Sequence, residues 1–119
     1  MTAVASLWPG LLVGIGGTLG ALARFGVDSR LGTRGVFVVN VVGSVVLGAL
    51  VAAPLDGGVL FVLGAGFCGA FTTFSSFAVG VVERAQEDEL IAAVRYATLM
   101  LVAALVGVGI GELFVRGFV

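Results

Sequence analysis

The sequence contains no histidine and no lysine, and charged residues make up only 11% of its 119 residues. Without histidine, the chain can form neither a histidine proton relay nor a Cys/His metal site or nucleophile pair. The single cysteine, Cys68, cannot form an internal disulfide. Six arginines and seven carboxylates give a net charge of −1, which excludes a basic nucleic-acid surface. These absences leave little material for catalysis, and we expect no enzyme.

Apolar residues dominate instead: 60% of the chain is hydrophobic, and the mean hydropathy is +1.23. Apolar runs of about 20 residues span a bilayer as helices. Four such runs fill most of the chain, at about residues 7–27, 35–53, 59–82 and 90–114. We therefore expect an all-α membrane protein with four transmembrane helices. It should form a single integral membrane domain over residues 1–119, located in the cell inner (plasma) membrane.

The first run could also be a secretory signal peptide. Leu11 to Ala23 ends in small residues that are typical of a cleavage site. A signal peptide needs a positively charged beginning, however, and residues 1–7 contain no Lys or Arg. The sequence therefore favours a first membrane span.

Twenty glycines are unusually many for so hydrophobic a chain. Small residues four apart let helix backbones approach closely in a membrane. The pairs with this spacing are Gly10 and Gly14, Gly16 and Gly20, and Gly107 and Gly111. We expect most of the glycines to serve helix packing.

The third run carries the densest polar signal, because Gly64, Gly66 and Gly69 precede the hydroxyl cluster Thr72, Thr73, Ser75 and Ser76. On a continuous helix, Phe71, Phe74 and Phe77 would face one side and the hydroxyls roughly the other. If the glycines break the helix, unwound carbonyls become available as ligands, which a membrane tolerates only inside protein or along a cavity. Both alternatives describe a permeation site. The alternative for each single hydroxyl is a bond back to the preceding turn.

Four further polar residues lie inside or near the spans. Asn40 can serve as a pore donor or hold two helices together. Arg24 can attract anions to a pore mouth or extend to the membrane interface. Tyr96 and Thr98 can be pore donors or interfacial anchors of the fourth helix.

The carboxylates all lie in loops or near span ends. A cation exchanger or proton-coupled exporter needs a carboxylate inside the membrane to hold its cation or proton. The polar groups inside the spans are instead hydrogen-bond donors, and phenyl rings add positive edges. This combination indicates selectivity for a small anion.

The arginines orient the chain only weakly. Arg30, Arg34 and Arg84 lie in the loops of one side, and Arg116 lies on the other. The positive-inside rule therefore gives a small bias. A chain that inserts in both directions could pair with its inverted copy, like the inverted repeats of transporters.

Three segments together resemble the CrcB/Fluc fluoride channels. These segments are Gly16 to Phe25 (GGTLGALARF), Asn40 to Ser44 (NVVGS) and Gly66 to Phe77 (GFCGAFTTFSSF). The resemblance covers all four spans in order. It implies an antiparallel, dual-topology homodimer that exports fluoride passively and lowers its cytoplasmic concentration. It also implies a break in the third helix and a structural sodium ion, which is not transported, at the dimer centre.

The resemblance also assigns site residues. Phe74 and Phe77 match the phenylalanines that line the fluoride pore, Asn40 the pore asparagine and Arg24 the arginine of the first span. Gly69 and Thr72 match the positions whose backbone carbonyls hold sodium. The remaining matches are Ser75 and Ser76 to a hydroxyl pair, although the second is usually Thr, and Tyr96 to a fourth-helix tyrosine.

The fourth span departs from the family pattern. Beyond Thr98 it contains no Ser or Thr, so the hydroxyl track of some members is missing. This leaves a heterodimer with a paralogous subunit possible.

Two other protein classes remain as alternatives. A small four-helix multidrug or cation exporter would need a carboxylate in its first span, and a non-transporting membrane assembly subunit would need no polar cluster in its third.

Overall fold

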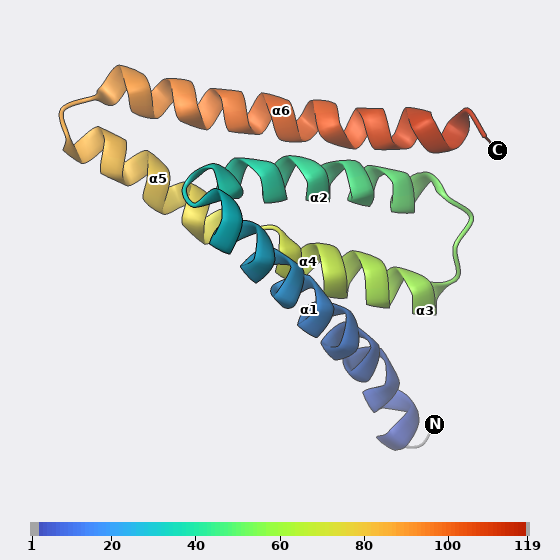
Figure 1. Cartoon of the computed structure of the whole chain (residues 1–119). Coiled ribbons are helices and arrows are strands. Elements are labelled where there is room, and N and C mark those ends of the chain that lie inside the picture. The colour runs from blue at the N-terminus through green and yellow to red at the C-terminus, as the bar shows by residue number, and fades with distance from the viewer. Residues whose placement is uncertain (1–2, 119) are drawn as a thin grey trace.

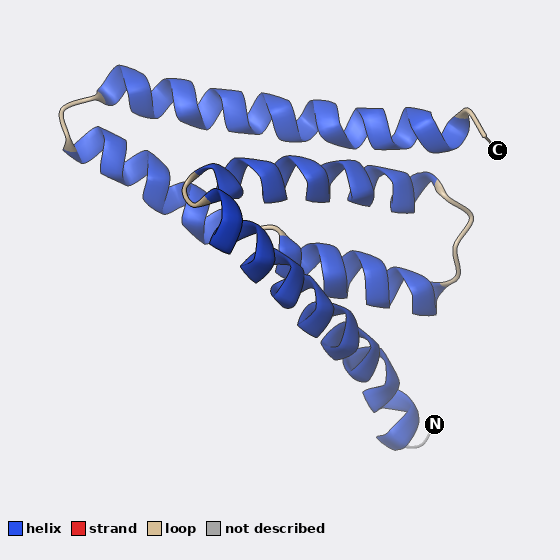
Figure 2. Ribbon diagram, viewed as in Figure 1, coloured by secondary structure: helices blue, strands red, loops and turns tan. Residues whose placement is uncertain are grey.

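The computed structural model describes residues 3–118, with side chains from residue 7, and is helical apart from short turns (Figures 1 and 2). The helical segments are α1 (Ala3–Leu31), α2 (Arg34–Ala52), α3 (Gly57–Leu60), η1 (Phe61–Cys68), α4 (Gly69–Phe71), α5 (Phe74–Gln86) and α6 (Leu90–Arg116). Four stretches are long and apolar enough to cross a membrane, at Leu7–Leu31, Arg34–Ala52, Gly57–Gln86 and Leu90–Arg116. The prediction of a multi-pass, all-helical membrane protein is therefore confirmed.

The third of these stretches is not one helix. It consists of α3, the π-helical segment η1, α4 and α5, and its chain is extended at Thr72 and Thr73, with ψ angles of 163° and 110°. The predicted break in the third helix is thus confirmed. The alternative of a continuous helix with Phe71, Phe74 and Phe77 on one face is wrong. The glycines of this stretch lie within helical segments, so they do not form the break.

Two helix crossings hold the fold together. α1 crosses η1 diagonally, and α2 lies beside α6 along most of its length (Figure 1). At the first crossing, a methyl group added to Gly16 or Gly20 would overlap backbone atoms of Val62 or Phe67. At the second, a methyl on Gly48 would overlap Val108, and one on Gly111 would overlap Val45. Backbone-to-backbone contact of this kind is available only to glycine.

The predicted glycine pairs differ in outcome. Gly16 and Gly20, and also Gly107 and Gly111, lie at these crossings as expected. A methyl group on Gly10 or Gly14 would contact nothing within 4 Å, so this pair packs against no other part of the described chain. Gly48 and Gly66 belong to the crossings although they lie in none of the predicted pairs.

The buried core is small. It contains Val39, Cys68, Phe71, Ala93 and Met100, together with the buried hydroxyl of Thr73. Large apolar side chains are exposed along every span, as expected for helices that face lipid or a partner chain. The core surrounds the helix break, so the best-buried part of the chain is the part that positions the candidate site.

Candidate functional site

The side-chain amide of Asn40, on α2, forms hydrogen bonds with both backbone polar groups of Thr73, at the helix break. Its Oδ1 accepts from the backbone N–H of Thr73 at 2.8 Å, and its Nδ2 donates to the carbonyl of Thr73 at 3.1 Å. The second Nδ2 proton faces the sulfur of Met100 on α6, at 3.9 Å. The Asn40 side chain therefore supplies hydrogen bonds that Thr73 would otherwise form within a helix, and it connects the second, third and fourth spans. This geometry shows the helix-connecting role that the sequence left open for Asn40.

The break leaves the four backbone carbonyls from Gly69 to Thr72 without their helical donors, and for two of them the structure shows what replaces the bond. In an α-helix, the N–H of Thr73 would bond to the carbonyl of Gly69, but here it bonds to Asn40. The N–H of Ser76 would likewise bond to the carbonyl of Thr72, but it bonds to Oγ1 of Thr73 at 3.2 Å. Gly69 and Thr72 are the two predicted sodium-binding positions. Unwound carbonyls of this kind can coordinate a sodium ion in a membrane.

The predicted pore rings lie on the α5 side of the break and form a series that ends on α6. The ring centroids of Phe74 and Phe77 are 5.7 Å apart, with an angle of 56° between the planes. Phe77 stacks on Tyr96, with centroids 5.8 Å apart. The tilted pair presents a ring edge, which is the positive part of the quadrupole. Phe71 is separate from this series, because it lies before the break and stacks on Phe67.

The hydroxyl pair at the start of α5 is linked to both the break and α1. Ser75 Oγ lies 3.3 Å from Oγ1 of Thr73. Ser76 Oγ accepts from Nη2 of Arg24 at 3.4 Å. Arg24 also forms an ion pair with Asp28, one turn along α1, at 3.6 Å. Both serines therefore point to protein polar groups, and Arg24 lies against the hydroxyl cluster.

Tyr96 and Thr98 have different surroundings. The ring of Tyr96 packs between Phe77 and the guanidinium of Arg84. Thr98 is exposed on α6 and lines none of the cavities described below. The structure thus brings Tyr96, and not Thr98, to the other predicted site residues.

Two hollows flank the break. A groove of about 670 Å³ between α2, η1, α5 and α6 is lined by Gly69, Thr72, Phe74 and Phe77, with Asn40 at its wall. A second hollow, of about 540 Å³, lies between the start of α2, α5 and the start of α6. Ser75, Ser76 and Tyr96 line this second hollow, which we name the polar vestibule. Apart from Arg24, which lines neither hollow, the predicted residues therefore divide between an apolar groove and a polar vestibule.

Thr73 and Arg84 have contacts that the sequence analysis did not single out. Thr73 appeared only as one hydroxyl of the cluster, yet it is 6% exposed and is the residue bonded by Asn40. Arg84 appeared only as a loop charge, although its guanidinium lies on the face of Tyr96. The spacing of Phe77, Gly80 and Arg84 on α5 is that of one helix face and was the available signal.

Comparisons with known proteins find related sequences over most of the chain. Residues 11–112 match the family described as "CrcB-like protein, Camphor Resistance (CrcB)". "Fluoride-specific ion channel FluC 2" of Natronomonas pharaonis is 44% identical over 108 residues, which cover 89% of this chain and 93% of the relative. "Fluoride-specific ion channel FluC 1" of Halobacterium salinarum is 43% identical over 111 residues, covering 90% and 93%. "Fluoride-specific ion channel FluC" of Francisella tularensis subsp. mediasiatica is 34% identical over 122 residues, covering 90% and 94%.

Proposed function

The chain belongs to the CrcB family, and from this premise we propose that it is a fluoride-selective channel that exports fluoride passively. The relatives named above are called fluoride-specific ion channels, which supports a channel and not an enzyme. The observation that carries the proposal is the ring series of Phe74, Phe77 and Tyr96, whose last member lines the same vestibule as the hydroxyls of Ser75 and Ser76.

This arrangement suits a small, strongly hydrated anion. Ring edges and hydroxyl protons can replace part of the water around fluoride without adding a full positive charge that would trap it. The guanidinium of Arg24 lies against Ser76, where it lowers the cost of bringing an anion near the hydroxyls. In this proposal Asn40 acts at the pore chiefly by fixing the break that orients α5.

The test is an efflux assay with the purified chain in liposomes. Fluoride should leave through the protein while chloride is retained, and the rate should not depend on a pH gradient. Collapse of the pH gradient with a protonophore should therefore leave fluoride efflux unchanged. Efflux that stops under this treatment would indicate coupled transport and would contradict a channel.

We further propose that a sodium ion binds at the break as a structural, non-transported cofactor. The carbonyls of Gly69 and Thr72 would hold it, and what supports this is that both have lost their helical donors. A bound cation would compensate the negative ends of these carbonyls. The apparent melting temperature should then be higher in sodium than in N-methylglucamine at equal ionic strength. Equal melting temperatures would argue against the site.

The proposed channel is an antiparallel dimer. The apolar groove opens beside Phe74, whose side chain is 78% exposed in the single chain. A second, inverted copy would cover this ring and bring its own Gly69 and Thr72 to the same centre. A paralogous subunit could do the same. The relatives from Natronomonas pharaonis and Halobacterium salinarum have the numbered names FluC 2 and FluC 1, which fits that alternative.

A further inference from the structure

Arg84 is the one arginine that lines the polar vestibule. Its Nη1 donates to the carbonyl of Gly80, one turn earlier on α5, at 2.8 Å. Its Cζ lies 4.0 Å from the centre of the Tyr96 ring. A guanidinium held by one carbonyl and one ring face keeps its full charge, and the Gly80 bond uses only one of its five N–H donors.

Gly80 makes room for this arrangement. A methyl group at this position would lie 3.1 Å from Cε1 of Tyr96 and 3.3 Å from Nη1 of Arg84. Both contacts are tighter than ordinary van der Waals contact, so a side chain here would displace the ring or the guanidinium. The glycine therefore fixes where the positive charge lies.

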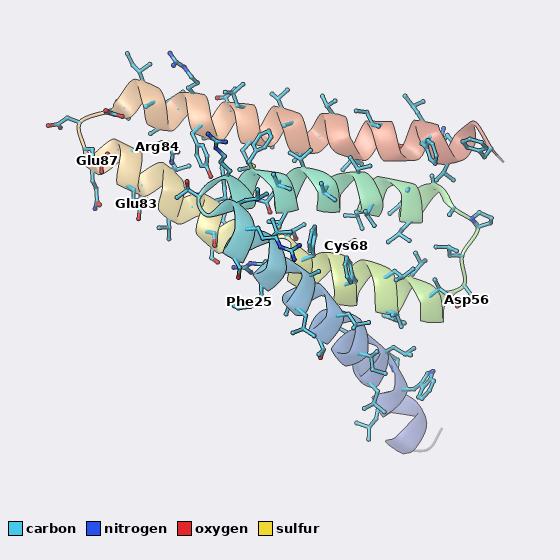
Figure 3. All side chains as sticks on the ribbon, viewed as in Figure 1. Phe25, Asp56, Cys68, Glu83, Arg84 and Glu87 are labelled. Carbon is cyan, nitrogen blue, oxygen red and sulfur yellow. The ribbon has the colours of Figure 1, made fainter. Side chains whose placement is uncertain are left out.

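Three acidic residues line the same vestibule. Glu83, Glu87 and Glu89 are exposed, whereas Arg84 is half-buried. The ion pairs found in the described part of the chain join Arg24 to Asp28 and Arg116 to Glu112, and neither includes Arg84. Figure 3 labels Glu83, Arg84 and Glu87 along the end of α5. Arg84 is thus less exposed than the three glutamates, and the lower dielectric around a half-buried residue strengthens the field of its charge.

The charge also lies at the outer end of the ring series. From the guanidinium, the series runs to Tyr96 at 4.0 Å, then to Phe77 at 5.8 Å and Phe74 at 5.7 Å. Ser75 and Ser76 line the same vestibule. We propose that Arg84, fixed on the face of Tyr96, attracts fluoride into the polar vestibule and is the entry site of the pathway. This inference rests on the proposed channel function.

The test compares Arg84→Gln and Arg84→Lys with the matched control Arg95→Gln. Arg95 is an exposed arginine at the start of α6 that does not line the vestibule. Initial fluoride efflux is measured from liposomes at low fluoride, in potassium gluconate of rising concentration. At low ionic strength, Arg84→Gln should lower the rate by about threefold or more, because a fixed charge raises the local anion concentration. Arg84→Lys should keep at least about half of the wild-type rate, because it keeps the charge.

The salt series separates attraction from a purely structural role. Screening becomes nearly complete within a few ångströms at about 1 M salt. The rates of wild type and Arg84→Gln should therefore converge as gluconate rises, and the wild-type rate itself should fall. A difference that is the same at every ionic strength, or a wild-type rate that does not fall with salt, would overturn the proposal even if Arg84→Gln folded poorly.

The outcomes also distinguish this inference from the function it rests on. If wild type passes no fluoride, the proposed function fails. If wild type passes fluoride and Arg84→Gln behaves like Arg95→Gln at low salt, the channel stands and the role of Arg84 is wrong.

Discussion

At the scale of single residues, one side-chain amide decides the course of the third span. Asn40 occupies the N–H and the carbonyl of Thr73, and the Thr73 hydroxyl takes the N–H of Ser76. These exchanges satisfy three of the polar groups that the interrupted helix leaves behind, which matters where no water can replace the lost bonds. They also release the carbonyls of Gly69 and Thr72. The break is therefore a hydrogen-bonded structure.

Replacing Asn40 by Asp tests this view. Asp has nearly the same shape but loses the donor to the Thr73 carbonyl and places negative charge against it. We expect the free energy of unfolding to fall by about 1–2 kcal/mol. Unfolding in a mixed-micelle denaturant titration measures the change. Thr18→Ala is the matched control, because the exposed Thr18 hydroxyl bonds only to the carbonyl of Gly14 in its own helix. Equal stability of the two variants would contradict the assigned role.

The pore rings lead to a second prediction at this scale. Phe74→Ile and Phe77→Ile keep most of the apolar volume but remove the polarised ring edge. Fluoride efflux should fall at least about tenfold in each variant, because fluoride loses its contact with the positive edge of the substituted ring. Size-exclusion chromatography should show unchanged assembly. Two variants that both conduct like wild type would mean that the rings serve packing alone.

At the scale of helices, glycine contacts set the positions of the broken span. α1 touches η1 at Gly16 and Gly20 with no side chain between the backbones. The same α1 carries Arg24 to Ser76, beyond the break. The first helix thus supports both halves of the third span, and a shift of one helix would move carbonyls and hydroxyls together.

Gly16→Ala and Gly14→Ala form a matched pair for this contact. A methyl group on Gly16 would overlap the carbonyl of Val62, while one on Gly14 meets nothing within 4 Å. Overpacking costs about 1–3 kcal/mol, whereas alanine is intrinsically about 1 kcal/mol better than glycine in a helix. The melting temperature should therefore fall in Gly16→Ala and stay equal or rise in Gly14→Ala. A lower melting temperature in Gly14→Ala than in Gly16→Ala would contradict the close backbone contact between α1 and η1.

The limits of sequence reasoning also appear at this scale. Hydropathy predicted the four spans because lipid demands long apolar helices. The resemblance placed the sodium-binding carbonyls of the break at Gly69 and Thr72, whereas the residues taken alone attributed the break to the glycines. Glycine is the usual helix breaker, yet Gly64, Gly66 and Gly69 stay helical and Thr72 and Thr73 do not. The position of the break depends on the hydrogen bonds from Asn40, which lies 33 residues before Thr73 in the sequence. No local pattern reports such a tertiary bond.

At the scale of the whole molecule, the chain has one small buried core and many exposed apolar side chains along its spans. The core lies around the break, while large side chains such as Phe25, at 71%, and Phe74, at 78%, remain exposed. Lipid can cover Phe25, but Phe74 lies beside the groove that holds the released carbonyls. This asymmetry fits the proposed pairing of two chains through the groove.

Dual topology gives the prediction for the whole molecule. Arg30, Arg34 and Arg84 oppose only Arg116, so C-terminal tags should be found on both sides of the membrane. Two or three lysines added beside Arg116 should shift the chain toward one orientation. Cells that depend on this variant alone should then lose fluoride resistance. C-terminal tags in wild type that report a single side would exclude the homodimer, unless a second small membrane protein co-purifies.

The packing around the break also equips the protein with its own chemical reporter. Cys68 is the sole thiol of the chain, is 4% exposed, and its carbonyl accepts both the N–H and the hydroxyl of Thr72. Cys68 lines the groove but is nearly covered, so a thiol-specific label reaches its sulfur from the groove only when the packing around it loosens. The labelling rate of the unmodified protein therefore reports how often this packing opens toward the groove, and a ligand or second chain that covers the groove would slow the labelling without any engineered probe.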